Sequence, residues 1–198
     1  MTITETCIAT HISPATGNPR NSEGSFLQLD DGRLVFAYSR YHADSWYDHA
    51  ACAICAVYST DEGASWTDTP EQLVSAADYG QENVMSVSLM RLANGDIGLF
   101  YLVEYPGTVS EYRMRRYRGD FSHLVEDVKI IPGRRPGYYV VNNDRVCRLA
   151  NGRLIVPAAL HPSAVCAEPG TPDAGWTDGR GSVVFFSSED DGHSWKEL

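Results

Sequence analysis

The chain of 198 residues is long enough to bury one sizeable core, and its 43% apolar and 21% charged residues are typical of a folded globular domain. With 16 basic and 26 acidic residues the formal net charge is −10, which disfavours nucleic acid or an anionic membrane as the main partner. A small anionic substrate remains compatible with this charge, because a few arginines in a cleft hold one carboxylate whatever the total.

The amino-terminal residues lack the basic and apolar segments of a secretory signal, so we expect a cytoplasmic location, with export left open. Five cysteines, at positions 7, 52, 55, 147 and 166, are odd in number and scattered, which argues against a disulfide framework. Cys52 and Cys55 form a CxxC pattern inside an apolar run, without a second pair of ligands, and are expected to pack in a strand. The sequence indicates no metal and no organic cofactor.

Three segments share one pattern, in which alternating apolar residues flank a polar turn that ends in glycine. They span residues 25–38, 87–101 and 145–157, with turns at Asp31-Gly32, Asn94-Gly95 and Asn151-Gly152. This pattern predicts β-hairpins with type I′ turns, since glycine adopts the positive φ that such turns require. The turn glycines lie 63 and 57 residues apart, a period that suits a four-stranded propeller blade with long loops.

Two octapeptides match the pattern S-x-D-x-G-x-S-W at every fixed position, each directly after a predicted strand. They occupy residues 59–66 and 188–195, which begin 129 residues apart. We expect the aspartate to accept backbone hydrogen bonds across the turn and the tryptophan to bury a large apolar area. The corresponding place in the middle unit, residues 116–122, lacks the serine, glycine and tryptophan positions.

The two octapeptides resemble the Asp box, or bacterial neuraminidase repeat, of the sialidase superfamily. The resemblance implies an all-β fold, a six-bladed β-propeller of the sialidase type, of which residues 1–198 hold about three blades. The blade units are expected at roughly residues 20–75, 80–130 and 138–198. In this family the boxes lie away from the catalytic face, so they identify the fold rather than the activity.

The resemblance also implies a role for Arg20. Family members open their first blade with an arginine, in an Arg-Ile-Pro motif, that is one of three holding the substrate carboxylate. Arg20 matches that place, although Asn21 and Ser22 replace Ile-Pro. A planar bidentate donor suits a carboxylate. The alternative is a surface arginine paired with Glu23, a residue that we also place among the substrate-binding candidates.

The family's general acid/base is an aspartate on the loop between the first hairpin and the strand that leads to the first box. Here Asp48 lies nearest that strand, and Asp44 is the second choice. A carboxyl group beside an aromatic wall has a raised pKa suited to proton donation. The alternative is a carboxylate that is simply solvated on the loop.

Further polar residues lie close to the repeat strands, where a propeller exposes its binding face. They are Asn83 before the second repeat, Asn142, Asn143, Asp144 and Arg145 before the third, and His161 after it. We consider them candidates for binding sugar hydroxyls. Alternatively, Asp144 and Arg145 bridge neighbouring blades, and His161 is solvated at a loop edge.

The resemblance implies an exo-acting glycoside hydrolase that removes a terminal acidic sugar, as an exo-α-sialidase does, from a glycan or sialoside-like substrate. Two alternatives remain, namely a propeller hydrolase for a different sugar and a non-catalytic glycan-binding propeller. The family's tyrosine nucleophile, its glutamate partner and two further arginines come from the fourth blade onward, and none of the eleven tyrosines here has a matching context. We therefore expect a piece of a longer protein, or alternatively a half-propeller that self-associates into a six-bladed ring.

Overall fold

The computed structural model describes residues 12–106, 109–131, 137–161 and 181–198 of the chain. Within these ranges the chain forms three antiparallel sheets, and its one helical element is the short 3₁₀ helix η1 (Ala76–Tyr79). The prediction of an all-β fold is confirmed. The three sheets do not close into a ring within the described residues.

Each sheet is built from one contiguous stretch of chain, and strands adjacent in sequence mostly pair with one another. Sheet 1 contains β1 (Arg20–Gln28), β2 (Leu34–Tyr41), β3 (Cys52–Ser59) and β4 (Glu71–Val74). Sheet 2 contains β5 (Val84–Arg91), β6 (Ile97–Tyr105), β7 (Val109–Tyr117) and β8 (Leu124–Lys129). Sheet 3 contains β9 (Tyr138–Val140), β10 (Cys147–Arg148), β11 (Leu154–His161), β12 (Ser182–Ser188) and β13 (Lys196–Glu197), with β9 and β10 both paired to β11.

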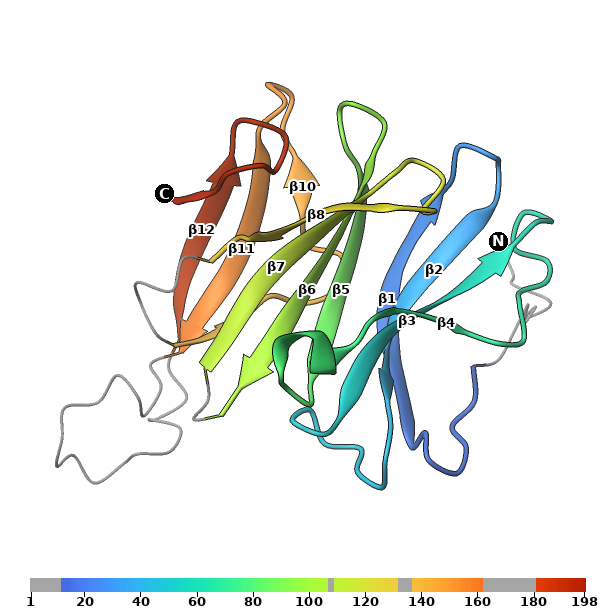
Figure 1. Cartoon of the computed structure of the whole chain (residues 1–198). Helices are drawn as coiled ribbons and strands as arrows, with labels where there is room; N and C mark the ends of the chain where they lie inside the picture. Colours follow the sequence, from blue (N-terminus) through green and yellow to red (C-terminus); the bar gives the residue numbers. More distant parts are fainter. Residues whose placement is uncertain (1–11, 107–108, 132–136, 162–180) are drawn as a thin grey trace, which may run out of the picture.

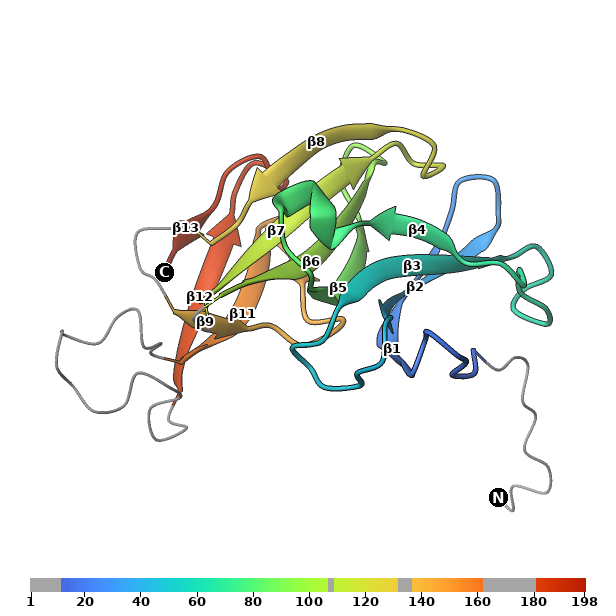
Figure 2. The same cartoon turned by 60° about the horizontal axis from the view of Figure 1, so that its bottom comes forward.

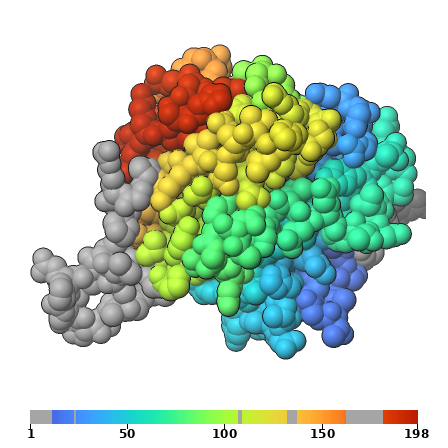
Figure 3. Space-filling model, viewed as in Figure 1, coloured from blue at the N-terminus to red at the C-terminus, as the bar shows by residue number. Residues whose placement is uncertain are grey.

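The sheets lie side by side in chain order, with sheet 2 between the other two (Figures 1 and 2). The space-filling view shows η1, β8 and the carboxyl-terminal segment gathered on one outer surface (Figure 3). Because sheet 2 lies between the other two sheets, it has an apolar layer on each of its faces. Its central strand, β6, is accordingly buried along most of its length.

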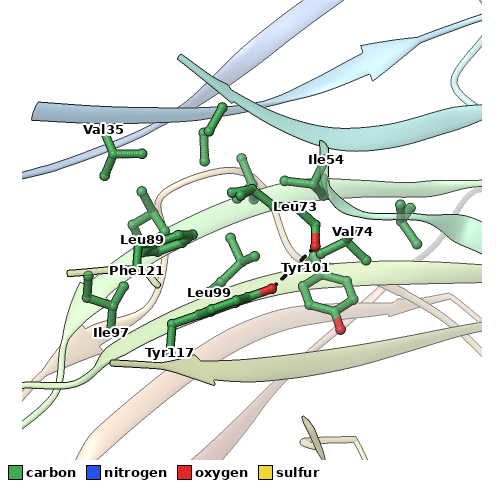
Figure 4. Packing of buried hydrophobic residues seen from close by; sticks show 14 of the residues in the cluster. Val35, Ile54, Leu73, Val74, Leu89, Ile97, Leu99, Tyr101, Tyr117 and Phe121 are labelled. Atoms are coloured by element: carbon green, nitrogen blue, oxygen red, sulfur yellow. Dashed lines mark hydrogen bonds between the residues drawn. The ribbon is translucent and has the colours of Figure 1, made fainter. Parts of the chain in front are cut away.

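One apolar layer fills the space between sheets 1 and 2. Val35 and Ile54 of sheet 1 meet Leu89 and Leu99 of sheet 2, and all four side chains are buried (Figure 4). Burial of each such side chain contributes roughly 1.5–3 kcal/mol relative to leaving it in water. A second layer, between sheets 2 and 3, includes Phe100, Met114, Tyr139, Val156 and Phe186.

The three predicted hairpins form, but their turns are not of the predicted type. In the first, the amide of Gly32 donates to Leu29 (3.0 Å) and the amide of Leu29 donates to Arg33 (2.8 Å), and the other two hairpins repeat these bonds. Only the glycine has a positive φ, 87° at Gly32, whereas a type I′ turn requires positive φ at both central residues. The type I′ prediction is therefore wrong, because each loop is a type I turn followed by a left-handed glycine. The side chain of Asp31 stabilises this form by accepting from the Arg33 amide (3.0 Å).

Both octapeptide turns fold around their aspartate. In the first, the carboxylate of Asp61 accepts from the amide (2.8 Å) and the hydroxyl (2.6 Å) of Ser65. The indole of Trp66 donates to the carbonyl of Gly63 (3.1 Å), and the turn at residues 188–195 repeats the same contacts. These hydrogen bonds hold the pKa of Asp61 well below its usual range, at about 2.

The two cysteines of β3 lie on opposite faces of sheet 1. Cys52 packs with the layer that contains Met85, whereas Cys55 packs with Tyr38 on the outer face of the sheet. Both thiols are free and buried, which raises the pKa of each. The predicted strand packing is confirmed for this pair, and Cys7 and Cys166 lie outside the described residues.

A change at Gly24 tests the close approach of β1 to β2. A Cβ atom there would lie 1.8 Å from the carbonyl oxygen of Ala37, which is backbone and cannot move aside. We expect Gly24→Ala to lower the free energy of unfolding by about 2 kcal/mol or more in urea denaturation. Gly152→Ala is the control, because its strain comes only from positive φ and costs about 1 kcal/mol. Equal losses in the two variants would contradict the steric argument.

The first octapeptide turn predicts a dependence of stability on pH. Because the pKa of Asp61 is lowered in the folded state, its charged form stabilises the fold at neutral pH, and this contribution disappears as pH falls from about 4 toward 2. We expect Asp61→Asn to unfold at lower urea concentration than the wild type at pH 7. The difference between the two should shrink below pH 4, whereas Glu62→Gln, an exposed change of the same charge, should show no such convergence.

Candidate functional site

A cavity of about 290 Å³ opens at the end of the sheets where β1 begins and β2 ends. Its polar lining consists of Arg20, Ser22, Ser39, Asp48, His49, Ser86, Asn142 and Asn143. Its apolar and aromatic lining consists of Tyr41, Met85, Leu102, Tyr138 and Val140. The octapeptide turns lie at the other end of the strands, since Ser59 pairs with Leu34 while Tyr41 pairs with Cys52.

Two of the predicted site residues meet directly in this cavity. The guanidinium of Arg20, the first residue of β1, donates to Asp48 (2.5 Å) and to the carbonyl of Trp46 (3.1 Å). It also lies over the ring of Tyr41, 4.5 Å from its centre. The side chain of Arg20 is one-third exposed and that of Asp48 is two-thirds exposed, so a ligand can reach both. The pair places a fixed cation and an accessible carboxylate at the cavity mouth.

Asn83 positions the loop that carries Asp48. Its side-chain amide donates to the carbonyls of Asp48 (2.8 Å) and Ala50 (2.6 Å), and its own backbone carbonyl accepts from Glu104 (3.1 Å). Asn83 is 3% exposed and does not line the cavity. The structure thus gives it a position behind the site, where it holds the loop backbone.

The polar segment before β10 divides into two parts. Asn142 and Asn143 line the cavity, and the side chain of Asn143 also accepts from the amide of Val87 (2.9 Å). Asp144 instead accepts from the hydroxyl of Ser25 (2.9 Å), and the Arg145 amide donates to the hydroxyl of Ser88, so both contact strands of other sheets. Neither of these two side chains lines the cavity.

The remaining predicted residues lie elsewhere. Asp44 is exposed on the loop between β2 and β3 and does not line the cavity. His161 ends β11, where it pairs with Tyr138, and does not line the cavity either. The backbone of Glu23 belongs to β1, but its side chain lies outside the described part of the chain.

A histidine–glutamate pair that was not predicted from the sequence lies beside Asp48. Nδ1 of His49 lies 2.5 Å from a carboxylate oxygen of Glu104, and the imidazole meets the ring of Tyr138 edge-on at 6.0 Å. Burial raises the pKa of Glu104, and the hydrogen bond with His49 opposes that rise. A signal was present, because Glu104 is the one charged residue in the apolar run of β6.

The aromatic wall of the cavity stays neutral near pH 7. Burial raises the pKa of Tyr41 and of Tyr138 well above the usual range for tyrosine. Both rings therefore act as apolar surfaces with neutral hydroxyl groups. In the described ranges no three His, Cys, Asp or Glu side chains gather as metal ligands, and no helix there is long and apolar enough to cross a membrane.

Removing the Asn83 amide tests its role in holding the loop. We expect Asn83→Ala to lower the free energy of unfolding by about 1–3 kcal/mol, because two partly buried carbonyls lose their donor. The amides of residues 42–51 should exchange hydrogen faster than in the wild type, as mass spectrometry can measure. Gln81→Ala, at a nearby and less buried position, should leave that exchange unchanged. Unchanged exchange in Asn83→Ala would show that other contacts fix the loop.

No protein-family model matches the sequence, and no curated protein matches it significantly. Solved structures do share its fold. A Hadza microbial sialidase matches with a TM-score of 0.67 at 15% identity, over 91% of this chain and 37% of that one. A protein of unknown function from Dyadobacter fermentans matches with a TM-score of 0.68 at 15% identity, over 94% and 56%.

A polysaccharide lyase, described as an ulvan lyase, matches with a TM-score of 0.56 at 16% identity, over 92% of this chain and 42% of that one. The chain therefore spans less than two thirds of the length of each of these structures. At such identities the likeness concerns the fold alone. The three sheets of this chain thus have the same arrangement as part of a larger fold found in a sialidase and in a lyase.

Proposed function

We propose that the three sheets are consecutive blades of a six-bladed β-propeller of the sialidase type, with units at roughly residues 20–75, 80–130 and 138–198. Two octapeptide turns and the fold shared with a sialidase support this proposal. The proposal also accounts for the apolar residues on the outer faces of the two end sheets. Phe26 of sheet 1 is 62% exposed, and Val183 of sheet 3 is 71% exposed. Further sheets of the same kind would cover both faces.

We propose that the cavity binds a terminal acidic sugar and that the propeller is an exo-acting glycoside hydrolase. The observation that carries this proposal is the contact between Arg20 and Asp48 inside a cavity that also presents Asn142 and Asn143. Arg20 supplies a charge-assisted donor for the sugar carboxylate. The two asparagines supply neutral hydrogen-bonding groups for hydroxyls.

In this proposal substrate binding prepares Asp48 for proton transfer. The sugar carboxylate takes the place of Asp48 on the guanidinium of Arg20 and leaves Asp48 without its cation. Asp48, released from the guanidinium, is then placed to donate a proton to the leaving oxygen. In this proposal the nucleophile and the remaining donors come from further blades of the propeller.

Two other functions would use the same cavity differently. A propeller hydrolase for a different sugar is favoured by the departure from Arg-Ile-Pro after Arg20. A non-catalytic glycan-binding propeller is favoured by the ion pair itself, since the guanidinium of Arg20 already engages the carboxylate of Asp48. The first alternative differs from the leading proposal in what Arg20 contacts, and the second differs from it in that Asp48 transfers no proton.

Charge-removing variants of the full-length gene product separate these functions. We expect Arg20→Ala to lower kcat/KM on acidic glycosides by about 100-fold through the lost charge-assisted contact. Asp48→Asn should lower kcat by about 100-fold or more on substrates with poor leaving groups, with ligand binding preserved. Asp44→Asn, an exposed change on the same loop, should leave both within about threefold.

Cleavage rates can be followed by release of the free sugar, and binding by calorimetry. Full activity in Asp48→Asn on a poor leaving group would remove Asp48 as the acid. Binding of acidic glycans without cleavage by any full-length variant, wild type included, would favour the glycan-binding function. Preference for neutral glycosides, unaffected by Arg20→Ala, would favour a hydrolase for a different sugar.

A further inference from the structure

A second hollow lies next to the cavity and shares one residue with it. This depression, of about 360 Å³, is lined by His49, Gln81, Glu82, Glu104, Tyr105 and Pro106, among others. His49 is the residue that lines both hollows. It comes directly after Asp48 on the loop between β2 and β3, so the ring stands at the junction of the two spaces.

Glu104 fixes the orientation of the His49 ring. The Glu104 side chain is 13% exposed and its backbone is anchored in β6, whereas the His49 side chain is 49% exposed. A carboxylate on Nδ1 selects the tautomer that carries a proton there, which leaves the lone pair on Nε2. Among the described residues Nε2 of His49 has no hydrogen-bond partner. The pair therefore offers a positioned acceptor on an accessible ring.

The depression has the composition of a site for a neutral sugar. Tyr105 and Pro106 provide apolar surface against which a sugar ring can pack. Gln81 and Glu82 provide an amide and a carboxylate for hydroxyl groups. The depression holds no Arg or Lys among its described lining residues, in contrast to the cavity with Arg20. The cavity thus suits a negatively charged group, and the depression suits a neutral one.

We propose that His49 is a specificity-determining residue: when a terminal acidic sugar occupies the cavity, Nε2 of His49 hydrogen-bonds the next sugar, which lies in the depression. This inference rests on the proposed function and adds the residues that recognise the linked sugar. Glu104 is then the residue that positions His49. A single acidic sugar linked to a small leaving group contacts neither Nε2 of His49 nor the depression.

A purely structural role for the pair has different consequences. In that case His49 serves only to balance the buried carboxylate of Glu104, whose second oxygen has no hydrogen-bond partner among the described residues. Loss of His49 would then disturb the loop and reduce turnover of every substrate to the same degree. The two roles are separated by comparing substrates that share the acidic sugar and differ only in the group to which it is linked.

The experiment compares two α-sialosides on the full-length gene product, the methyl glycoside and the lactose-linked trisaccharide. Both have alcohol leaving groups, so the chemistry of departure is matched. We expect His49→Gln and Gln81→Ala to lower kcat/KM on the trisaccharide about tenfold, and on the methyl glycoside less than about threefold, since only one of the two substrates makes the lost contact. Glu104→Gln should behave like His49→Gln. His42→Gln, an exposed change on the same loop, should alter neither.

An equal loss on both substrates, or no loss on either, overturns the two-sugar proposal while leaving the hydrolase intact. If the wild type cleaves neither sialoside, the proposed hydrolysis of this sugar is wrong, and binding measurements then test the two-sugar proposal. In that case a shift of the His49 ring resonance in NMR with the trisaccharide, larger than with the methyl glycoside, supports the proposal. The same shift with both, or none with either, overturns it.

Discussion

Hydrogen bonds that link the edge strands β1 and β5 to each other and to the segment before β10 set the geometry of the molecule. The hydroxyl of Ser25 in β1 accepts from the amide of Leu89 in β5 and donates to Asp144 (3.0 and 2.9 Å). The side chain of Asn143 accepts from the amide of Val87 (2.9 Å). Each contact supplies a partner to a buried strand edge that would otherwise lack one. The apolar layers between the sheets then pack around spacings that these short side chains determine.

The cavity depends on the same contacts because its walls come from all three sheets. Arg20 opens sheet 1, Ser86 lies at the bulge of β5, where its φ is 61°, and Asn143 precedes β10. A change in the spacing of any two sheets would alter the distance between these groups. The site therefore requires the packing of all three sheets against one another, and no single sheet contains it.

The sequence predicted the strands and the octapeptide turns well, because alternation and the glycine positions are local signals. It predicted the wrong hairpin turn, because a glycine after Asp or Asn is compatible with either a type I′ turn or a type I turn with a left-handed glycine. It assigned Arg20 and Asp48 to the site, but gave no indication that their side chains contact each other. The partnership of His49 with Glu104 joins residues 55 positions apart, and such pairing is set by the packing of β6 against the loop.

The two free thiols of β3 have a consequence for assembly. Cys52 lies between sheets, whereas Cys55 lies on the outer face of sheet 1, where its cover depends on Tyr38 and Phe36 in this chain. A maleimide reagent reaches either thiol only when the packing above it opens. The ratio of the two labelling rates therefore reports whether another sheet covers that face. A single strand thus carries both a reporter of cover over the outer face of sheet 1 and its internal reference.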